Sequence, residues 1–168
     1  MLGLHGRHDD TDKQVEHGKR RRHDERDEEG PRFIIVEPEQ ANCLQKSAQA
    51  GKPVVVTGDL ETLMAGLACG EVSSLAWTIL QNGADDFMTL SEEAIPQAMR
   101  MLASGEYTKV AIEGGESAVP GFAAAIIAKK EPKFAEKLNL TENSRVLVIG
   151  TEGATDADLY RQIIDNKI

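Results

Sequence analysis

The sequence has few of the features that mark secreted, membrane-spanning or nucleic-acid-binding proteins. It contains only 2 cysteines, too few for a disulfide framework, so we expect reduced thiols and a cytoplasmic location. No apolar run reaches the roughly 20 residues that a membrane span needs, and the charged N-terminal region does not resemble a signal peptide. The 19 basic residues face 28 acidic ones, and the net charge of −9 argues against a nucleic-acid partner.

The first part of the chain, residues 1–31, shows almost no apolar periodicity. It holds the basic run at residues 19–22 and the acidic stretch at residues 24–29. Such a composition cannot bury enough surface to offset the chain entropy, so we predict a disordered, charged segment. Translation from a wrong start or a shifted reading frame is a second interpretation of it. All four histidines also lie here, but nothing around them would fix a metal's geometry, so we predict no metal site from His5, His8, His17 and His23.

From Arg32 onward, apolar runs alternate with segments of helical periodicity. The apolar runs lie at residues 33–36, 54–59, 86–90, 110–112 and 145–149, and the last of them has the clearest pattern of a buried strand. Helices are expected over residues 41–50, 60–70, 74–83, 91–104, 122–130, 133–138 and 157–164. This alternation predicts an α/β fold with a mostly parallel, twisted sheet flanked by helices.

The side-chain pattern also predicts particular caps and core residues. Ser73 or Ser74 and Ser91 occupy positions that suit helix N-caps. The residues expected to face inward or to fill the core are Cys43, Met64, Cys69, Leu75, Ile79, Leu80, Met88, Ile95, Ala98, Met99, Met101 and Leu102.

A loop of small residues at 111–121 leads directly into the alanine-rich helix. Ser117 stands at the expected N-cap, and Pro120 is tolerated in a first turn because its missing N–H would have no partner there. One interpretation is a tight loop in which Glu116 is an ordinary acid and Ser117 a helix cap. The other is a ligand site, since N–H groups at a helix start suit anionic or polar atoms. Ligands of parallel sheets bind at the carboxyl ends of strands, where we expect the loops at 113–121 and 150–156.

Four motifs resemble the diaminopropionate ammonia-lyases, which are pyridoxal-phosphate enzymes of the group that includes threonine dehydratase and the tryptophan synthase β chain. They are Phe-Ile-Ile-Val-Glu-Pro at 33–38, the segment 58–71, Gly-Gly-Glu-Ser-Ala at 114–118 and Thr-Glu-Gly-Ala-Thr-Asp at 151–156. The resemblance covers residues 32–165. It implies the carboxyl-terminal part of a lyase domain over residues 32–168, with part of the tryptophan synthase β-like fold, fold type II. These enzymes release pyruvate and ammonia from 2,3-diaminopropionate.

The resemblance also implies pyridoxal 5′-phosphate as cofactor and a small amino acid as substrate. It places Glu116 and Ser117 beside the cofactor ring, and Gly66 where the backbone comes close to it. Relatives usually carry serine at the position of Gly150, facing the pyridine nitrogen. The hydroxyl for that nitrogen would here come from Thr151 or Ser117, and an ordinary loop hydroxyl is the alternative role for Thr151.

Three parts of the family's chemistry are not found in the sequence. The lysine that carries the cofactor, the catalytic segments that carry aspartate and the glycine-rich phosphate loop all lie upstream of the 33–38 motif in the family. Lys13 and Lys19 stand in patternless charged sequence, a poor setting for a desolvated nucleophile. We therefore assign no catalytic residue, and we expect weak cofactor binding and no activity from this chain alone.

Two hypotheses of function remain open. The chain is either a truncated or mis-started lyase polypeptide, or a non-catalytic remnant or interaction module of the same fold. A partial sheet leaves apolar edges uncovered, so we expect a homodimer or assembly with an amino-terminal half.

Overall fold

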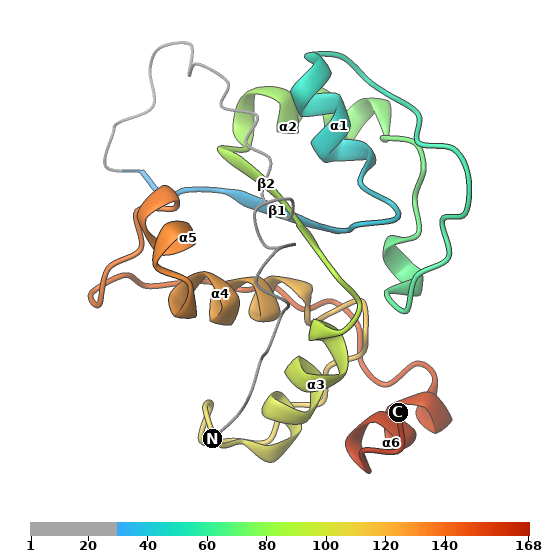
Figure 1. Ribbon diagram of the computed structural model, residues 1–168, viewed down its shortest axis with the longest axis vertical. Helices are drawn as coiled ribbons and strands as arrows, with labels where there is room; N and C mark the ends of the chain where they lie inside the picture. The colour runs from blue at the N-terminus through green and yellow to red at the C-terminus, as the bar shows by residue number, and fades with distance from the viewer. Residues whose placement is uncertain (1–29) are drawn as a thin grey trace.

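The computed structural model describes residues 30–168, and the statements below refer to them (Figure 1). Its elements are β1 (Ile34–Pro38), α1 (Cys43–Ala50), the 3-10 helix η1 (Ala65–Leu67), α2 (Ser74–Gly83), β2 (Asp86–Leu90), α3 (Ala94–Ser104), α4 (Pro120–Lys130), α5 (Pro132–Lys137) and α6 (Ala157–Ile164). The four histidines, Lys13 and Lys19 lie outside the described residues, as does nearly all of the segment predicted to be disordered.

The two strands pair in parallel. Ile34 lies opposite Asp86, and the register continues to Pro38 opposite Leu90. Parallel neighbours need a crossover connection, which α1 and α2 provide. The α/β fold with parallel pairing is therefore confirmed.

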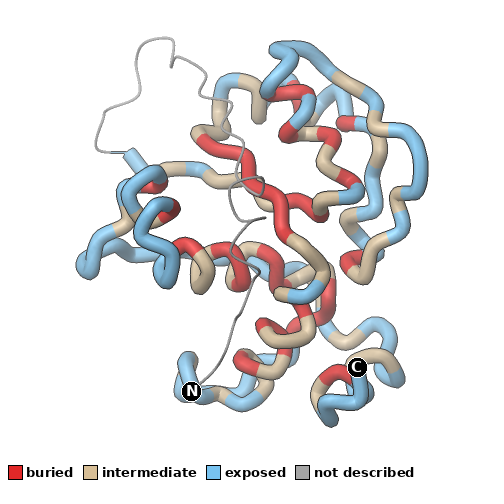
Figure 2. Tube along the Cα trace, in the orientation of Figure 1, coloured by how far each residue is buried: buried red, intermediate tan, exposed pale blue. Residues whose placement is uncertain are grey.

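Successive residues of the strands face opposite sides, and each side has its own hydrophobic core. On one side, Ile35 and Phe87 pack with residues of α1 and α2 such as Cys43 and Trp77. On the other side, the alternate strand residues Ile34, Val36, Met88 and Leu90 pack with α3, α4, α5 and α6. The helices contribute Ile95, Met99, Ala124, Phe134 and Ile163 to this second core. Figure 2 shows β2 buried along its length between these helices.

An ion pair fixes the start of both strands. The Arg32 guanidinium donates to both carboxylate oxygens of Asp86, over 2.7 Å and 3.2 Å. The backbone N–H of Phe33 donates to the Asp85 carboxylate over 2.8 Å. Asp86 is buried, and a buried charge needs such a partner. The pair therefore helps to set the strand register.

The prediction of a buried strand at residues 145–149 is wrong. The segment has no regular secondary structure, and Leu147 and Ile149 are 86% and 76% exposed. A strand forms only against a hydrogen-bonded neighbour, and none of the backbone hydrogen bonds found in the described part of the chain involves this segment. Residues 54–59 and 110–112 form no strand either.

The helix predictions agree with the structure more closely than the strand predictions do. Ser73 caps α2 by accepting from the N–H of Ala76, as expected. Leu75 and Ile79, expected to face inward, are exposed because α2 buries Trp77 instead. α3 has Glu93 and not Ser91 at its N-cap position.

The helix expected over residues 60–70 shrinks to the single turn η1. Two glycines of this segment, Gly66 and Gly70, lie close to other parts of the chain. A Cβ at Gly70 would lie 2.6 Å from the carbonyl oxygen of Val56. Cys43 is buried as expected, but Cys69 is exposed. The four methionines predicted for the core are all buried: Met64, Met88, Met99 and Met101. Among the helices within residues 30–168, none has both the length and the apolar character needed to cross a membrane.

Candidate functional site

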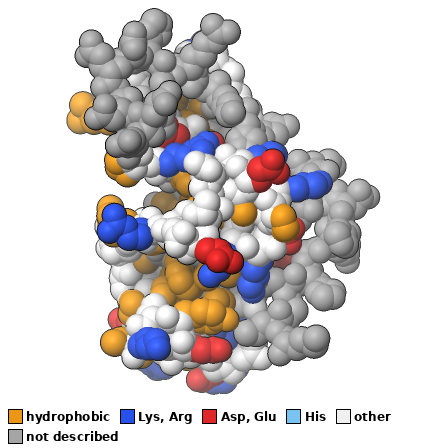
Figure 3. Space-filling model, turned by 90° about the vertical axis from the view of Figure 1, so that its left-hand side faces the viewer, with side chains coloured by type: hydrophobic (Ala, Val, Ile, Leu, Met, Phe, Trp, Pro, Cys, Tyr) orange, Lys and Arg blue, Asp and Glu red, His pale blue; other side chains and the backbone are white. Residues whose placement is uncertain are grey.

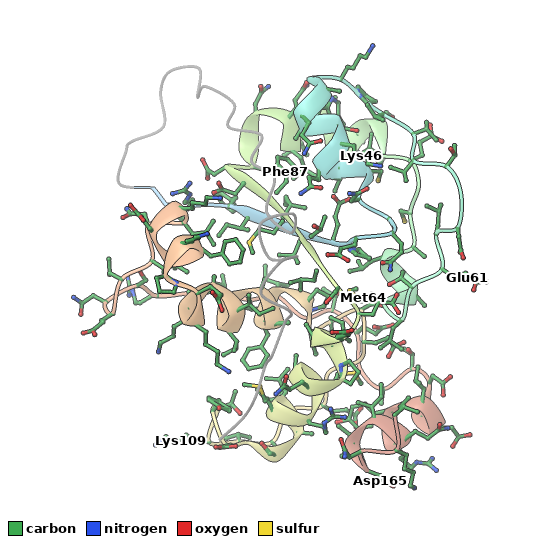
Figure 4. The ribbon with its side chains drawn as sticks, in the orientation of Figure 1. Lys46, Glu61, Met64, Phe87, Lys109 and Asp165 are labelled. Carbon is green, nitrogen blue, oxygen red and sulfur yellow. The ribbon has the colours of Figure 1, made fainter. Side chains whose placement is uncertain are left out.

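Two residues of the predicted site, Gly66 and Ser117, meet in the structure. The backbone N–H of Gly66 donates to the hydroxyl oxygen of Ser117 over 2.9 Å. A Cβ at position 66 would lie only 3.0 Å from that oxygen, so glycine permits this approach. Met64, fully buried in the core beside α3, anchors the turn that carries Gly66 (Figure 4).

The expectation that Ser117 caps the following helix is wrong. α4 begins at Pro120, its N-cap residue is Val119, and no side chain caps it. Pro120 does lie in the first turn, as expected. Because the Ser117 oxygen accepts from Gly66, its own O–H remains able to donate to another group.

Glu116 is a buried acid in the same loop. It is only 5% exposed, and its Oε2 atom has no hydrogen-bond partner among the described residues. An unpartnered buried carboxylate oxygen is unfavourable, so this atom suits a donor supplied by a ligand. We name the group of Gly66, Glu116 and Ser117 the ring wall, after the cofactor ring beside which the family resemblance places these residues.

The loop at 150–156 packs against the ring wall. Glu152 accepts from the backbone N–H of Ser117 over 2.9 Å, and its carbonyl oxygen accepts from the N–H of Gly115 over 3.3 Å. A Cβ at Gly115 would collide with the carbonyl oxygen of Gly153, so the two loops touch backbone to backbone. Glu152 belongs to the Thr-Glu-Gly-Ala-Thr-Asp motif at 151–156, and no role was predicted for it.

Thr151 lies on this second loop. It is exposed, and it directly precedes Glu152. Gly150, on its other side, passes within ordinary contact distance of Ala118, because a Cβ there would lie 3.5 Å from Ala118. The structure thus brings Gly66 and Ser117 into contact and places Thr151 on the adjacent loop.

The described residues offer no buried lysine. All eight lysines within residues 30–168 are exposed. Lys46, labelled on α1 in Figure 4, is one of them. A nucleophilic lysine needs a desolvated setting or a cationic neighbour that lowers its pKa, so these lysines do not fit that role.

A protein-family model described as pyridoxal-phosphate dependent enzyme matches residues 17–152. The match begins within the segment predicted to be disordered. Diaminopropionate ammonia-lyase of Escherichia coli (strain K12) is 40% identical over 134 residues, which cover 78% of this chain and 34% of that protein. L-threo-3-hydroxyaspartate ammonia-lyase of Saccharomyces cerevisiae is 28% identical over 138 residues, covering 82% and 38%.

Solved structures give the same picture. Holo diaminopropionate ammonia lyase from Escherichia coli matches with a TM-score of 0.72 and 36% identity, covering 81% of this chain and 34% of that one. Maize serine racemase matches with a TM-score of 0.61 at 23% identity, covering 81% and 39%, which shows the fold alone. The chain spans about one third of the length of the curated relatives it matches.

Proposed function

Because this chain belongs to the family of pyridoxal-phosphate dependent enzymes, we propose that it is a carboxyl-terminal portion of a diaminopropionate ammonia-lyase. The overall reaction consumes 2,3-diaminopropionate and one water and yields pyruvate and two molecules of ammonia. The observation that carries the proposal is the ring wall, where two polar side chains and a close backbone approach meet inside motifs shared with that enzyme.

The ring wall fits one side of the family's cofactor. Pyridoxal phosphate supplies, when bound, an electron sink for negative charge on the substrate. The free Oε2 of Glu116 can accept a hydrogen bond, and the O–H of Ser117 can donate one. We propose that Ser117 or Thr151 meets the pyridine nitrogen, and that Gly66 lets the backbone lie close to the ring.

The lysine and the phosphate-binding loop of the proposed enzyme would have to come from outside residues 30–168. We therefore propose assembly with an amino-terminal half, or self-association as a homodimer. The exposed run at 145–149 supports this proposal because it has strand-forming residues and no strand partner within the described residues. Figure 3 also shows hydrophobic side chains gathered on one face of the molecule.

A non-catalytic remnant or interaction module of the same fold is the second candidate, favoured by the exposed position of every described lysine. The DNA upstream of this reading frame separates the two candidates. If it encodes the missing lysine and glycine loop, the lyase proposal is supported. An unrelated, intact upstream gene would support the remnant. We also propose a cytoplasmic location, from the low cysteine number.

A chimera tests the proposal biochemically. Residues 32–165 of this chain would replace the matching segment of the Escherichia coli enzyme. We expect the chimera to bind pyridoxal phosphate, seen by visible absorbance, and to release pyruvate from 2,3-diaminopropionate. Within it, S117A should weaken cofactor binding, whereas S144A, at an exposed turn, should not. A folded chimera that binds no cofactor would contradict the proposal.

A further inference from the structure

Glu152 uses its carboxylate and its carbonyl oxygen to hold the loop that carries the ring wall. One carboxylate oxygen accepts from the N–H of Ser117 over 2.9 Å, and the other accepts from the hydroxyl of Thr155 over 3.1 Å. Its carbonyl oxygen accepts from the N–H of Gly115. The two oxygens of the carboxylate therefore have separate partners, Ser117 on the opposite loop and Thr155 on its own loop.

A second glutamate ties the same two loops in the reverse direction. Glu113 accepts from the backbone N–H of Ala154 over 3.3 Å. The contact of Gly115 with Gly153 leaves no room for a side chain between the loops. With the backbones this close, a small shift of one loop would break several of these hydrogen bonds together.

We propose that Glu152 is a positioning residue for the ring wall. Its carboxylate holds the backbone of Ser117, and so keeps the Ser117 hydroxyl against the N–H of Gly66 with Glu116 beside it. The purpose that we give to this arrangement is to present the ring wall to the cofactor. That purpose rests on the proposed function. One consequence is specific: the N–H of Ser117 is already satisfied, so it is not free to bind an anionic group of a ligand.

Three variants of the 168-residue chain separate the acceptor role from other effects. E152A removes the carboxylate. E152Q keeps an oxygen for Ser117, and its amide can donate to the Thr155 hydroxyl, so it should rescue the contact. T155V is the matched control, because it removes the hydroxyl and leaves the Ser117 hydrogen bond. If E152A does not fold, E152D retains the charge but withdraws it from Ser117 by one methylene.

Amide hydrogen exchange, followed residue by residue by NMR, measures the result without any cofactor. We expect the amide of Ser117 to exchange roughly tenfold faster or more in E152A, and near the wild-type rate in E152Q and T155V. Amides in α3 should be unchanged in all of them. Equal protection of Ser117 in E152A and the wild type would overturn the proposal.

Titration with pyridoxal phosphate then tests the purpose of the arrangement. We expect chemical-shift changes at Glu116 and Ser117 in the wild type and in E152Q, and their loss in E152A. Shift changes of equal size in E152A would overturn the positioning role. If exchange responds as expected but the wild type shows no shift on titration, the proposed function fails and the hold of Glu152 on the loop stands.

Discussion

The carboxylate of Glu37, at the end of β1, accepts a hydrogen bond from the backbone N–H of Gln45 in the first turn of α1 over 2.8 Å. Its other oxygen accepts from the N–H of Leu44 over 2.9 Å. α1 has no cap from its own N-cap side chain, Asn42, so Glu37 fills that role from the strand. Burial outweighs these hydrogen bonds and raises the pKa of Glu37 above its ordinary value of 4.5.

This raised pKa predicts how the stability of the protein depends on pH. The native state binds the Glu37 proton more tightly than the unfolded chain does. The contribution of Glu37 is therefore fully present below pH 4.5, the unfolded value, and is lost as pH rises through the native pKa. E37Q should remove this part of the pH dependence, and lower stability by about 1 kcal/mol at low pH because one N–H loses its acceptor.

Urea midpoints measured from about pH 4 to about pH 8 for the wild type and E37Q provide the check. E142Q, at an exposed position, is the control and should follow the wild-type profile. Parallel profiles for the wild type and E37Q would show that Glu37 does not titrate differently in the two states.

Substitution of Gly66 tests the contact at the ring wall. In G66A the new Cβ would lie 3.0 Å from the Ser117 oxygen, so one of the two loops must shift. We expect a loss of about 1 kcal/mol in the free energy of unfolding, from urea denaturation. G83A is the matched control, because its Cβ would lie 3.9 Å from the nearest atom, a side-chain carbon of Ile79. Equal stability of the two variants would exclude a tight contact at Gly66.

Limited proteolysis tests the predicted domain boundary. The composition of residues 1–31 predicts that a protease of broad specificity, such as proteinase K, trims the chain up to the region of Gly30 and leaves the remainder resistant. Mass spectrometry of the fragments over time identifies the sites. Early cleavage around Ile34, with a protected N-terminus, would contradict the boundary.

Self-association is expected from the exposed run at 145–149. In sizing chromatography at high concentration the chain should elute as a species larger than a monomer. L147K, at a side chain that is 86% exposed, should move it toward the monomer. L75K, at an exposed position on α2, is the control and should not. A sharp monomer peak for the wild type at all concentrations would argue against self-association.

The isolated chain should be inactive. Catalysis in this family needs a lysine bound to the cofactor, and every described lysine is exposed. We expect no lysine-imine absorbance band when pyridoxal phosphate is mixed with the chain, and no pyruvate from 2,3-diaminopropionate. If both signals occur, a lysine that we set aside, Lys13 or Lys19 first, is catalytic.

Elements whose signals are local could be predicted from the sequence. β2 and α6 have the predicted bounds, because a short apolar run and a capped amphipathic turn each depend on neighbours in sequence. The run at 145–149 carries an equally clear strand pattern but does not form a strand. Its pattern reports a preference for burial, and burial also requires a neighbouring strand that the described residues do not supply.

The candidate site was predictable to a similar degree. The loop pattern and the family motifs indicated Gly66, Glu116 and Ser117, and the structure joins the first and last of these by a hydrogen bond. The partner of Ser117 could not be foreseen, because Gly66 lies 51 residues away and no local pattern encodes that distance. Glu152 was missed for the same reason, since its contacts with Ser117 and Gly115 depend on how two loops pack.

The alternation of side chains between the two cores along β1 limits which insertions and deletions the protein can tolerate. Ile34 and Val36 belong to one core and Ile35 to the other, so each strand residue is committed to one side of the sheet. Insertion or deletion of a single codon within Ile34–Pro38 would send every later strand residue to the opposite side, so both cores would lose their partners at once. In the connection between α3 and α4, where residues 109–111 are exposed and precede Glu113, the same codon change would only lengthen or shorten a loop.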